Sequence, residues 1–89
     1  MQQLFFVGCY THPSMNGKGQ GIYTCGLEPI TGKLTLLETL PITNPSYLAF
    51  DKNHEYIFAV EEFGKDLNPH VHSFKVDAGK LEPLSQRPI

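Results

Sequence analysis

The chain repeats itself after about fifty residues, and this repeat constrains its fold more than any other feature. Leu4–Cys9 resembles Tyr56–Glu61 at an offset of 52 residues, and Ile22–Leu27 resembles Val71–Val76 at an offset of 49. The tripeptide Gly-Lys-Leu then recurs at an offset of 47. The matched segments have the length and composition of short strands and turns. A repeat of this period is typical of a β-propeller or a similar array, in which one unit cannot bury both of its faces.

The second copy of the repeat contains a complete set of four predicted strands. They are Ser46–Phe50, Tyr56–Val60, Val71–Val76 and Leu81–Ser85. Tyr56–Val60 is apolar throughout, which predicts a strand covered on both faces. Asp77–Lys80 predicts a tight hairpin turn, and in the polar turn after Phe50 we expect Asn53 or His54 at positive φ. Pro83 cannot donate a backbone hydrogen bond, so the last strand should lie at the sheet edge.

The first copy lacks the strand that opens the second copy. Its predicted strands are Leu4–Cys9, Gly21–Leu27 and Leu34–Leu40, and no segment shows helical periodicity. We therefore expect an all-β protein containing about one and three-quarter four-stranded antiparallel blades. Residues 1–89 would form the N-terminal portion of one β-propeller domain, with a partial blade at 1–40 and a complete blade at 44–86. A first blade without its inner strand is what a ring closed by its two chain ends would show.

Composition and charge limit the partners and the compartment. The formal net charge is −2, and Arg87 is the single arginine. Nucleic acids and anionic membranes require clusters of Lys and Arg, so we expect neither as a partner. The N-terminus lacks the basic start of a signal peptide, and no apolar run approaches the ~20 residues of a membrane span. We therefore expect a cytoplasmic protein in which Cys9 and Cys25 are reduced.

Five segments in register carry a resemblance to a known family. They are Val7–Thr11 (VGCYT), Gly21–Tyr23 (GIY), Thr31–Leu34 (TGKL), Asn44–Ala49 (NPSYLA) and Ile57–Glu62 (IFAVEE). Together they resemble the N-terminal part of the lactonase family of seven-bladed β-propellers, which includes bacterial 6-phosphogluconolactonase. The family usually has Ser-Pro-Asp-Gly at the turn where this chain has Asp51–His54. The resemblance implies that the 89 residues correspond to about a quarter of a family member.

The resemblance also implies a function. A 6-phosphogluconolactonase adds water to 6-phosphogluconolactone and releases 6-phosphogluconate, in the pentose phosphate pathway. It implies a small-molecule lactone or sugar phosphate as partner and no cofactor. The family's suspected catalytic residues lie in later blades, so the catalytic residues stay unassigned. We expect this segment to need the remaining blades or self-association, and to be inactive alone. Two alternatives stay open: a non-catalytic propeller that binds a protein or small molecule, and a related lactone-forming cycloisomerase.

In a propeller, the loop after each second strand and the connection between blades open on the same rim. The two longest irregular segments, Tyr10–Gln20 and Phe63–Pro69, are loops of the first kind, and Thr43–Pro45 is the connection between blades. Because loops on a rigid scaffold carry function, we expect any ligand site on this rim. Its polar side chains are Tyr10, Thr11, His12, Lys18, Asn44, Glu62, Lys65, Asp66 and His70.

Three of these residues, His12, Asn44 and Glu62, are the rim candidates. Lactone hydrolysis needs a base to activate water, and His12 and Glu62 have that chemistry. Lys18 and Lys65 have the charge to face a phosphate group. For each of these four side chains, the competing interpretation is a solvated residue or a hydrogen bond that orders the loop. Asn44 is first of all a cap or turn residue at the entry into the inner strand.

Two further patterns have structural interpretations. His70 and His72 share one face of a strand, but no third ligand is evident, so we expect no metal site. Gly17–Gly21 is rich in glycine but lacks the Gly-Lys-Ser/Thr ending of a phosphate-binding loop. It also precedes a predicted strand instead of a helix. We interpret it as a flexible loop that enters the strand.

Overall fold

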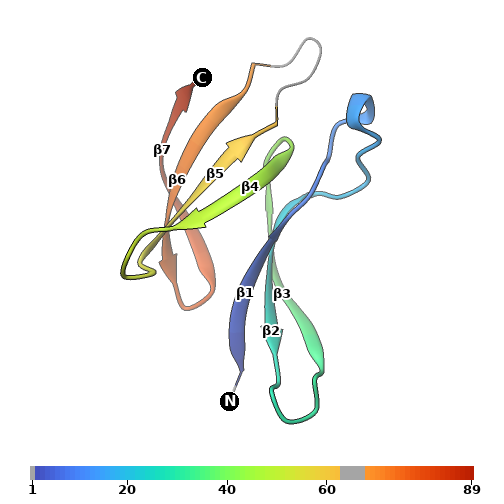
Figure 1. The fold of residues 1–89 in the computed structure, drawn as a ribbon, viewed down its shortest axis with the longest axis vertical. Helices are drawn as coiled ribbons and strands as arrows, with labels where there is room; N and C mark the ends of the chain where they lie inside the picture. Colours follow the sequence, from blue (N-terminus) through green and yellow to red (C-terminus); the bar gives the residue numbers. More distant parts are fainter. Residues whose placement is uncertain (1, 63–67) are drawn as a thin grey trace.

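The chain folds into two antiparallel β-sheets that stand side by side (Figure 1). The computed structural model describes residues 2–62 and 68–89. The first sheet has the strand order β1-β2-β3 and the second β4-β5-β6-β7. The strands are β1 (Gln3–Gly8), β2 (Gly21–Leu27), β3 (Leu34–Pro41), β4 (Pro45–Phe50), β5 (Tyr56–Glu61), β6 (His70–Asp77) and β7 (Lys80–Pro88).

The strand order confirms the architecture predicted from the repeat. Within each sheet, every strand pairs with the next one along the chain, and the first sheet begins at the strand that corresponds to β5 of the second. Only β2 has the predicted bounds, and β7 differs most because it runs to Pro88 instead of Ser85. The edge position predicted for the strand containing Pro83 is also confirmed. Pro83 lies beside a register shift in the pairing of β6 with β7.

Two of the turns contain residues at positive φ. In the β6–β7 hairpin, Ala78 has φ 51° and Gly79 has φ 88°. Two successive residues at positive φ match the right-handed twist of the flanking strands, as in a type I′ turn. In the β4–β5 turn it is His54, with φ 58°, and not Asn53 that takes the left-handed conformation. The conformations of these turns therefore help to fix the register of both hairpins.

A short helical turn lies where no helix was expected. The 3₁₀ helix η1 covers Pro13–Met15, within the loop between β1 and β2. Pro13 has its φ preset for the first helical position, and the His12 side chain accepts a hydrogen bond from the Ser14 amide. Three residues are too few to produce an apolar periodicity, so a prediction based on helical periodicity misses η1. Among the described residues, no helix has the length and apolar character needed to cross a membrane.

The hydrophobic core lies between the two sheets. Ile22 from β2 packs with Ile57 and Ala59 from β5 and with Phe74 from β6, and all four are at most 3% exposed. Burying a large aliphatic or aromatic side chain contributes about 1.5–3 kcal/mol. Because these side chains come from both sheets, the two sheets share one core, and neither sheet has a core of its own in the described part of the chain.

The far face of the second sheet is uncovered in the described structure. Tyr47 is 70% exposed and Phe58 is 40% exposed, although β5 is apolar on both faces. Ile57 and Ala59 are buried on the side that meets the first sheet. Cover on both faces of Tyr56–Val60 was predicted, and the structure supplies it on one face only. The reason is that a single neighbouring sheet can pack against only one side.

Backbone contact between the sheets occurs where β1 ends and β4 begins. A Cβ atom added at Gly8 would collide with the backbone carbonyl oxygen of Pro45. At the other end of β4, the ring of Phe50 meets that of Phe6 with centroids 5.7 Å apart and planes tilted by 60°. Glycine at position 8 therefore allows β1 and β4 to approach at one end of the shared core.

We predict that Gly8→Ala lowers the free energy of unfolding by about 1–3 kcal/mol, the usual cost of forcing an extra carbon into a packed contact. Gly26→Ala is the matched control in the neighbouring strand, because its added Cβ would meet only the flexible end of the Gln2 side chain at 2.9 Å. Chemical denaturation of the native gene product measures both variants. Equal stability of the two variants would contradict the proposed backbone contact.

The hydrogen bonds of Asp51, in the turn after β4, predict that the stability of the protein depends on pH. The Asp51 carboxylate accepts hydrogen bonds from the amides of Tyr56 at 2.9 Å, Glu55 at 2.8 Å and Asn53 at 3.4 Å. These bonds lower the pKa of Asp51 from its ordinary value of 3.8, and the bond from Tyr56 has the largest effect on it. A lowered folded-state pKa stabilises the fold at pH values above 3.8, and this contribution is lost as the pH falls through the folded-state value.

We therefore predict that Asp51→Asn destabilises the protein at neutral pH. The difference from wild type should shrink during acid titration below pH 3.8. Asp77→Asn is the control, because the side chain of Asp77 accepts no hydrogen bond in the described part of the chain. Melting temperatures measured across the titration test this. A constant difference between wild type and Asp51→Asn would show that the carboxylate has no such role.

Candidate functional site

One end of the two sheets gathers the segments predicted to form a rim. Figure 1 shows the β1–β2 loop with η1 and the β3–β4 connection at the same end. The β2–β3, β4–β5 and β6–β7 turns lie at the opposite end (Figure 1). The loop at the first end includes residues 9–20, whose backbone is held by hydrogen bonds such as Gly17 N to His12 O at 3.0 Å and Gly19 N to Tyr10 O at 3.1 Å. The glycine-rich segment is thus tied to its own loop.

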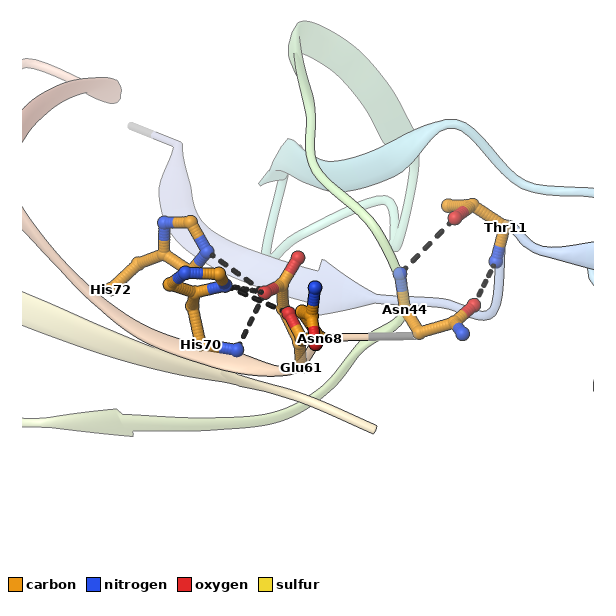
Figure 2. Close-up of polar contacts among 6 residues, drawn as sticks. All are labelled: Thr11, Asn44, Glu61, Asn68, His70 and His72. Atoms are coloured by element: carbon orange, nitrogen blue, oxygen red, sulfur yellow. Dashed lines mark hydrogen bonds and ion pairs between the residues drawn. The ribbon is translucent and has the colours of Figure 1, made fainter. Parts of the chain in front are cut away.

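Asn44 joins this loop to the second sheet (Figure 2). Its side-chain Oδ1 accepts hydrogen bonds from the amides of Thr11 at 2.8 Å and His12 at 2.9 Å. Its own amide donates to Thr11 Oγ1 at 3.1 Å. Its carbonyl oxygen accepts from the amides of Ser46 at 2.7 Å and Glu62 at 2.8 Å. Asn44 is fully buried and has φ 44°, so it serves as the predicted turn residue and also connects two sheets.

One side-chain atom of Asn44 has no hydrogen-bond partner in the described structure. Its Nδ2 is buried and has no hydrogen-bond partner among residues 2–62 and 68–89. An unpaired buried donor costs free energy, because it loses its hydrogen bonds to water without replacement. The acceptor atoms of Asn44 are therefore fully used, while its side-chain donor, Nδ2, is not.

Glu62, Tyr10 and Ser46 form a hydrogen-bonded cluster beside Asn44. Tyr10 OH donates to Glu62 Oε1 at 3.3 Å, and Ser46 Oγ donates to the same oxygen at 3.0 Å. Tyr10 and Glu62 are 52 residues apart, which is also the offset of the sequence repeat. They are thus equivalent positions of the two blades, each following the corresponding strand. Sequence reasoning selected Tyr10 and Glu62 for the rim but missed Ser46, which it placed only within a strand.

A small hollow lies next to this cluster. It has a volume of about 100 Å³ and is lined by Thr43, Glu61, Glu62, Asn68 and Pro69. A larger open groove of about 400 Å³ lies between the sheets, lined mainly by apolar side chains such as Leu40, Ile42 and Phe74. The groove holds few polar groups that could perform chemistry, whereas the rim hollow is lined by two carboxylates. We therefore place the candidate site at the rim.

Two other predicted rim residues, His12 and Lys18, are not brought into this cluster by their side chains. His12 contributes its amide to Asn44, but its Nδ1 accepts from the Ser14 amide at 3.1 Å and lies 2.8 Å from Ser14 Oγ. The imidazole therefore caps η1. Lys18 makes no polar side-chain contact in the described structure. Lys65 and Asp66 lie outside the described residues.

His70 and His72 gather around a carboxylate that sequence reasoning did not connect with them (Figure 2). Glu61 Oε1 accepts a hydrogen bond from the His70 amide at 2.7 Å, and it lies 3.3 Å from His70 Nδ1 and 3.5 Å from His72 Nε2. His70 Nδ1 also donates to the carbonyl oxygen of Asn68 at 2.8 Å, and the His72 ring stacks on Phe74 at 5.9 Å. Within the described ranges, no group of three or more His, Cys, Asp or Glu side chains is arranged to hold a metal ion.

The two cysteines are both free. Cys9 lies one residue beyond the end of β1, and its Sγ donates a hydrogen bond to the carbonyl oxygen of Gly21 at 3.1 Å. Cys25 lies within β2. Both side chains are half-buried and act as small packing residues of the first sheet.

Two antiparallel sheets of related sequence, packed through a shared core with their long loops at one end, define a segment of a β-propeller. Residues 4–89 match the family described as Lactonase, 7-bladed beta-propeller. The chain therefore belongs to the lactonase family of seven-bladed β-propellers. No curated protein matches the chain.

Solved structures with the same fold come from several bacteria. A candidate 6-phosphogluconolactonase from Bacteroides uniformis is 31% identical with a TM-score of 0.82, and the match covers 98% of this chain and 24% of that protein. A second, from Bacteroides fragilis, is 31% identical with a TM-score of 0.80 over 96% of this chain and 23% of that protein. The periplasmic gluconolactonase of Pseudomonas aeruginosa is 29% identical with a TM-score of 0.82 over 96% and 24%. The chain thus spans about a quarter of the length of these proteins.

The hydrogen bonds of Asn44 predict that substitution lowers stability and affects two particular backbone amides. Asn44→Gly permits the positive φ but removes the acceptor of two amides, and each amide left unpaired costs about 1–3 kcal/mol. We therefore expect lower stability and faster hydrogen exchange at the amides of Thr11 and His12 in the native gene product. Asn44→Asp keeps an acceptor oxygen and should retain most of this protection. Unchanged exchange at both amides in Asn44→Gly would refute the role of Asn44.

Proposed function

We propose that the native gene product is a lactonase that hydrolyses 6-phosphogluconolactone to 6-phosphogluconate, a step of the pentose phosphate pathway. The observation that carries this proposal is the family match over residues 4–89, joined to the likeness to two candidate 6-phosphogluconolactonases at 31% identity. The chain spans about a quarter of those proteins, so the proposal concerns the whole propeller. This segment contributes one arc of the rim on which we place the site.

The reaction sets requirements that the rim can meet in part. Water adds to the ester carbonyl, a base takes the proton from that water, and hydrogen-bond donors stabilise the developing oxyanion. We propose that His12, Asn44 and Glu62 face the substrate from this arc. His12 has an Nε2 without a partner in the described part of the chain, and Asn44 has an unused buried donor. The other catalytic groups and the cations for a phosphate would come from the rest of the propeller.

Two further parts of the proposal concern partners and location. Further blades would cover the exposed far face of the second sheet around Tyr47 and Phe58, which otherwise favours self-association.

We propose a cytoplasmic location because Cys9 and Cys25 are both free, as is usual for thiols in a reducing compartment. The relative from P. aeruginosa is named periplasmic, so the location does not follow from family membership.

A specific observation favours a second candidate substrate. The P. aeruginosa relative is named a gluconolactonase, which acts on the lactone without a phosphate group. Around Glu62, the described cluster consists of a carboxylate and two hydroxyl groups, which suit sugar hydroxyls better than a phosphate. The two substrates differ only in the phosphate, so one assay distinguishes them.

We predict that the native gene product accelerates hydrolysis of 6-phosphogluconolactone above the rate in buffer. Inorganic phosphate should compete with this substrate but not with glucono-δ-lactone, because only the first presents a phosphate to the site. Acid release measured at constant pH reports both reactions. Faster hydrolysis of glucono-δ-lactone alone would favour the second candidate. No acceleration of either lactone would contradict the lactonase proposal and favour a non-catalytic propeller.

A further inference from the structure

We propose that Glu62 recognises the hydroxyl groups of the substrate and is not the catalytic base. This inference rests on the proposed lactonase function. It assigns Glu62 to the sugar portion of the lactone, away from its ester carbonyl and away from any phosphate group. The class of ligand is a polyhydroxylated lactone or its ring-opened acid.

The Glu62 carboxylate is held in place from several directions. The Glu62 amide donates to the Asn44 carbonyl oxygen at 2.8 Å, which fixes its backbone at the end of β5. Ser46 Oγ from β4 and Tyr10 OH from the loop after β1 both donate to Oε1. These three segments come from two different sheets. A carboxylate restrained in this way loses little conformational entropy when it binds a ligand.

The same carboxylate still has acceptor capacity. An ionised carboxylate offers about four acceptor positions on two oxygens, and both protein hydroxyl groups use Oε1. Oε2 has no hydrogen-bond partner in residues 2–62 and 68–89. Glu62 also lines the rim hollow of about 100 Å³. The structure therefore presents an oriented acceptor, partly unused, beside an open space.

Sugar hydroxyl groups suit this acceptor better than a phosphate group does. Sugar hydroxyl groups are donors, and their hydrogen bonds to a carboxylate are about twice as strong as those between neutral groups. A phosphate group would be repelled, because Glu61 lines the same hollow as Glu62 and both carry carboxylates. The hydroxyl groups of Tyr10 and Ser46 already donate to Glu62, but their oxygens can still accept from a neighbouring sugar hydroxyl. The cluster thus matches a run of hydroxyl groups.

The test compares two lactones that share the ring but differ in hydroxyl groups. Glucono-δ-lactone carries hydroxyls along its ring, and δ-valerolactone carries none. In the native gene product, Glu62→Gln should raise KM for glucono-δ-lactone about tenfold, the expected effect of losing one charge-assisted hydrogen bond. KM for δ-valerolactone and kcat for both lactones should change less than about twofold. Tyr10→Phe should shift the same KM in the same direction by a smaller factor.

The control is Glu55→Gln, which removes a carboxylate before β5 at the opposite end of the sheets and should leave both KM values unchanged. A collapse of kcat for both lactones in Glu62→Gln would overturn the inference and assign Glu62 the role of base. Equal KM values for wild type and variant would also overturn it.

A separate measurement distinguishes failure of this inference from failure of the proposed function. If wild type hydrolyses neither lactone, the lactonase proposal fails, and binding of D-gluconate followed by NMR titration decides the role of Glu62. About tenfold weaker binding to Glu62→Gln than to wild type would support hydroxyl recognition. Equal binding by the two proteins, or no binding by wild type, would overturn it.

Discussion

The hydrogen bonds of Asn44 are the interaction on which the arrangement of the rim depends. They connect the loop after β1, the start of β4 and the residue that follows β5, which belong to two different sheets. The apolar core around Ile57 holds the same sheets together, but hydrophobic burial is non-directional and scales with area. Hydrogen bonds are directional, so Asn44 fixes how the loop stands relative to the second sheet. Without this anchor, the side chains of Tyr10 and Glu62 would not be held within reach of each other.

The contact between Tyr10 and Glu62 follows from the repeat itself. The two residues occupy the same position in consecutive blades, and their separation of 52 residues equals the repeat offset. Equivalent positions of neighbouring blades can touch only where the sheets converge, and in this chain that is where β1 meets β4. In a ring of such units, every blade contributes one residue at this position. The chemistry at the mouth of the ring is therefore distributed along the sequence, and one arc supplies only part of it.

The fold could be predicted from the sequence because its determinants are local. Strand periodicity, the hairpin at Ala78 and Gly79 and the turn at His54 each depend on a few consecutive residues, and the repeat supplied the order of the strands. The candidate site was predictable only in part. Tyr10, Asn44 and Glu62 were placed on one rim from loop lengths, but the bonds that hold them there join distant residues. Thr11 and Asn44 are 33 positions apart, and Tyr10 and Glu62 are 52 positions apart. The pairing of Glu61 with His70 and His72 was missed, because it depends on which strands are neighbours and on which face each side chain lies. The role of His12 as a cap of η1 had a local signal, since Pro13 and Ser14 follow it directly.

The central claim is that this arc of a lactonase propeller presents a carboxylate, oriented through Asn44, to the hydroxyl groups of a lactone. A crystal structure of the native gene product with bound D-gluconate tests that claim most directly. We predict gluconate on the rim that carries η1, with one of its hydroxyl oxygens about 2.5–2.7 Å from a Glu62 carboxylate oxygen. Gluconate bound at the end that carries the β4–β5 and β6–β7 turns, or on the rim without a contact to Glu62, would contradict it.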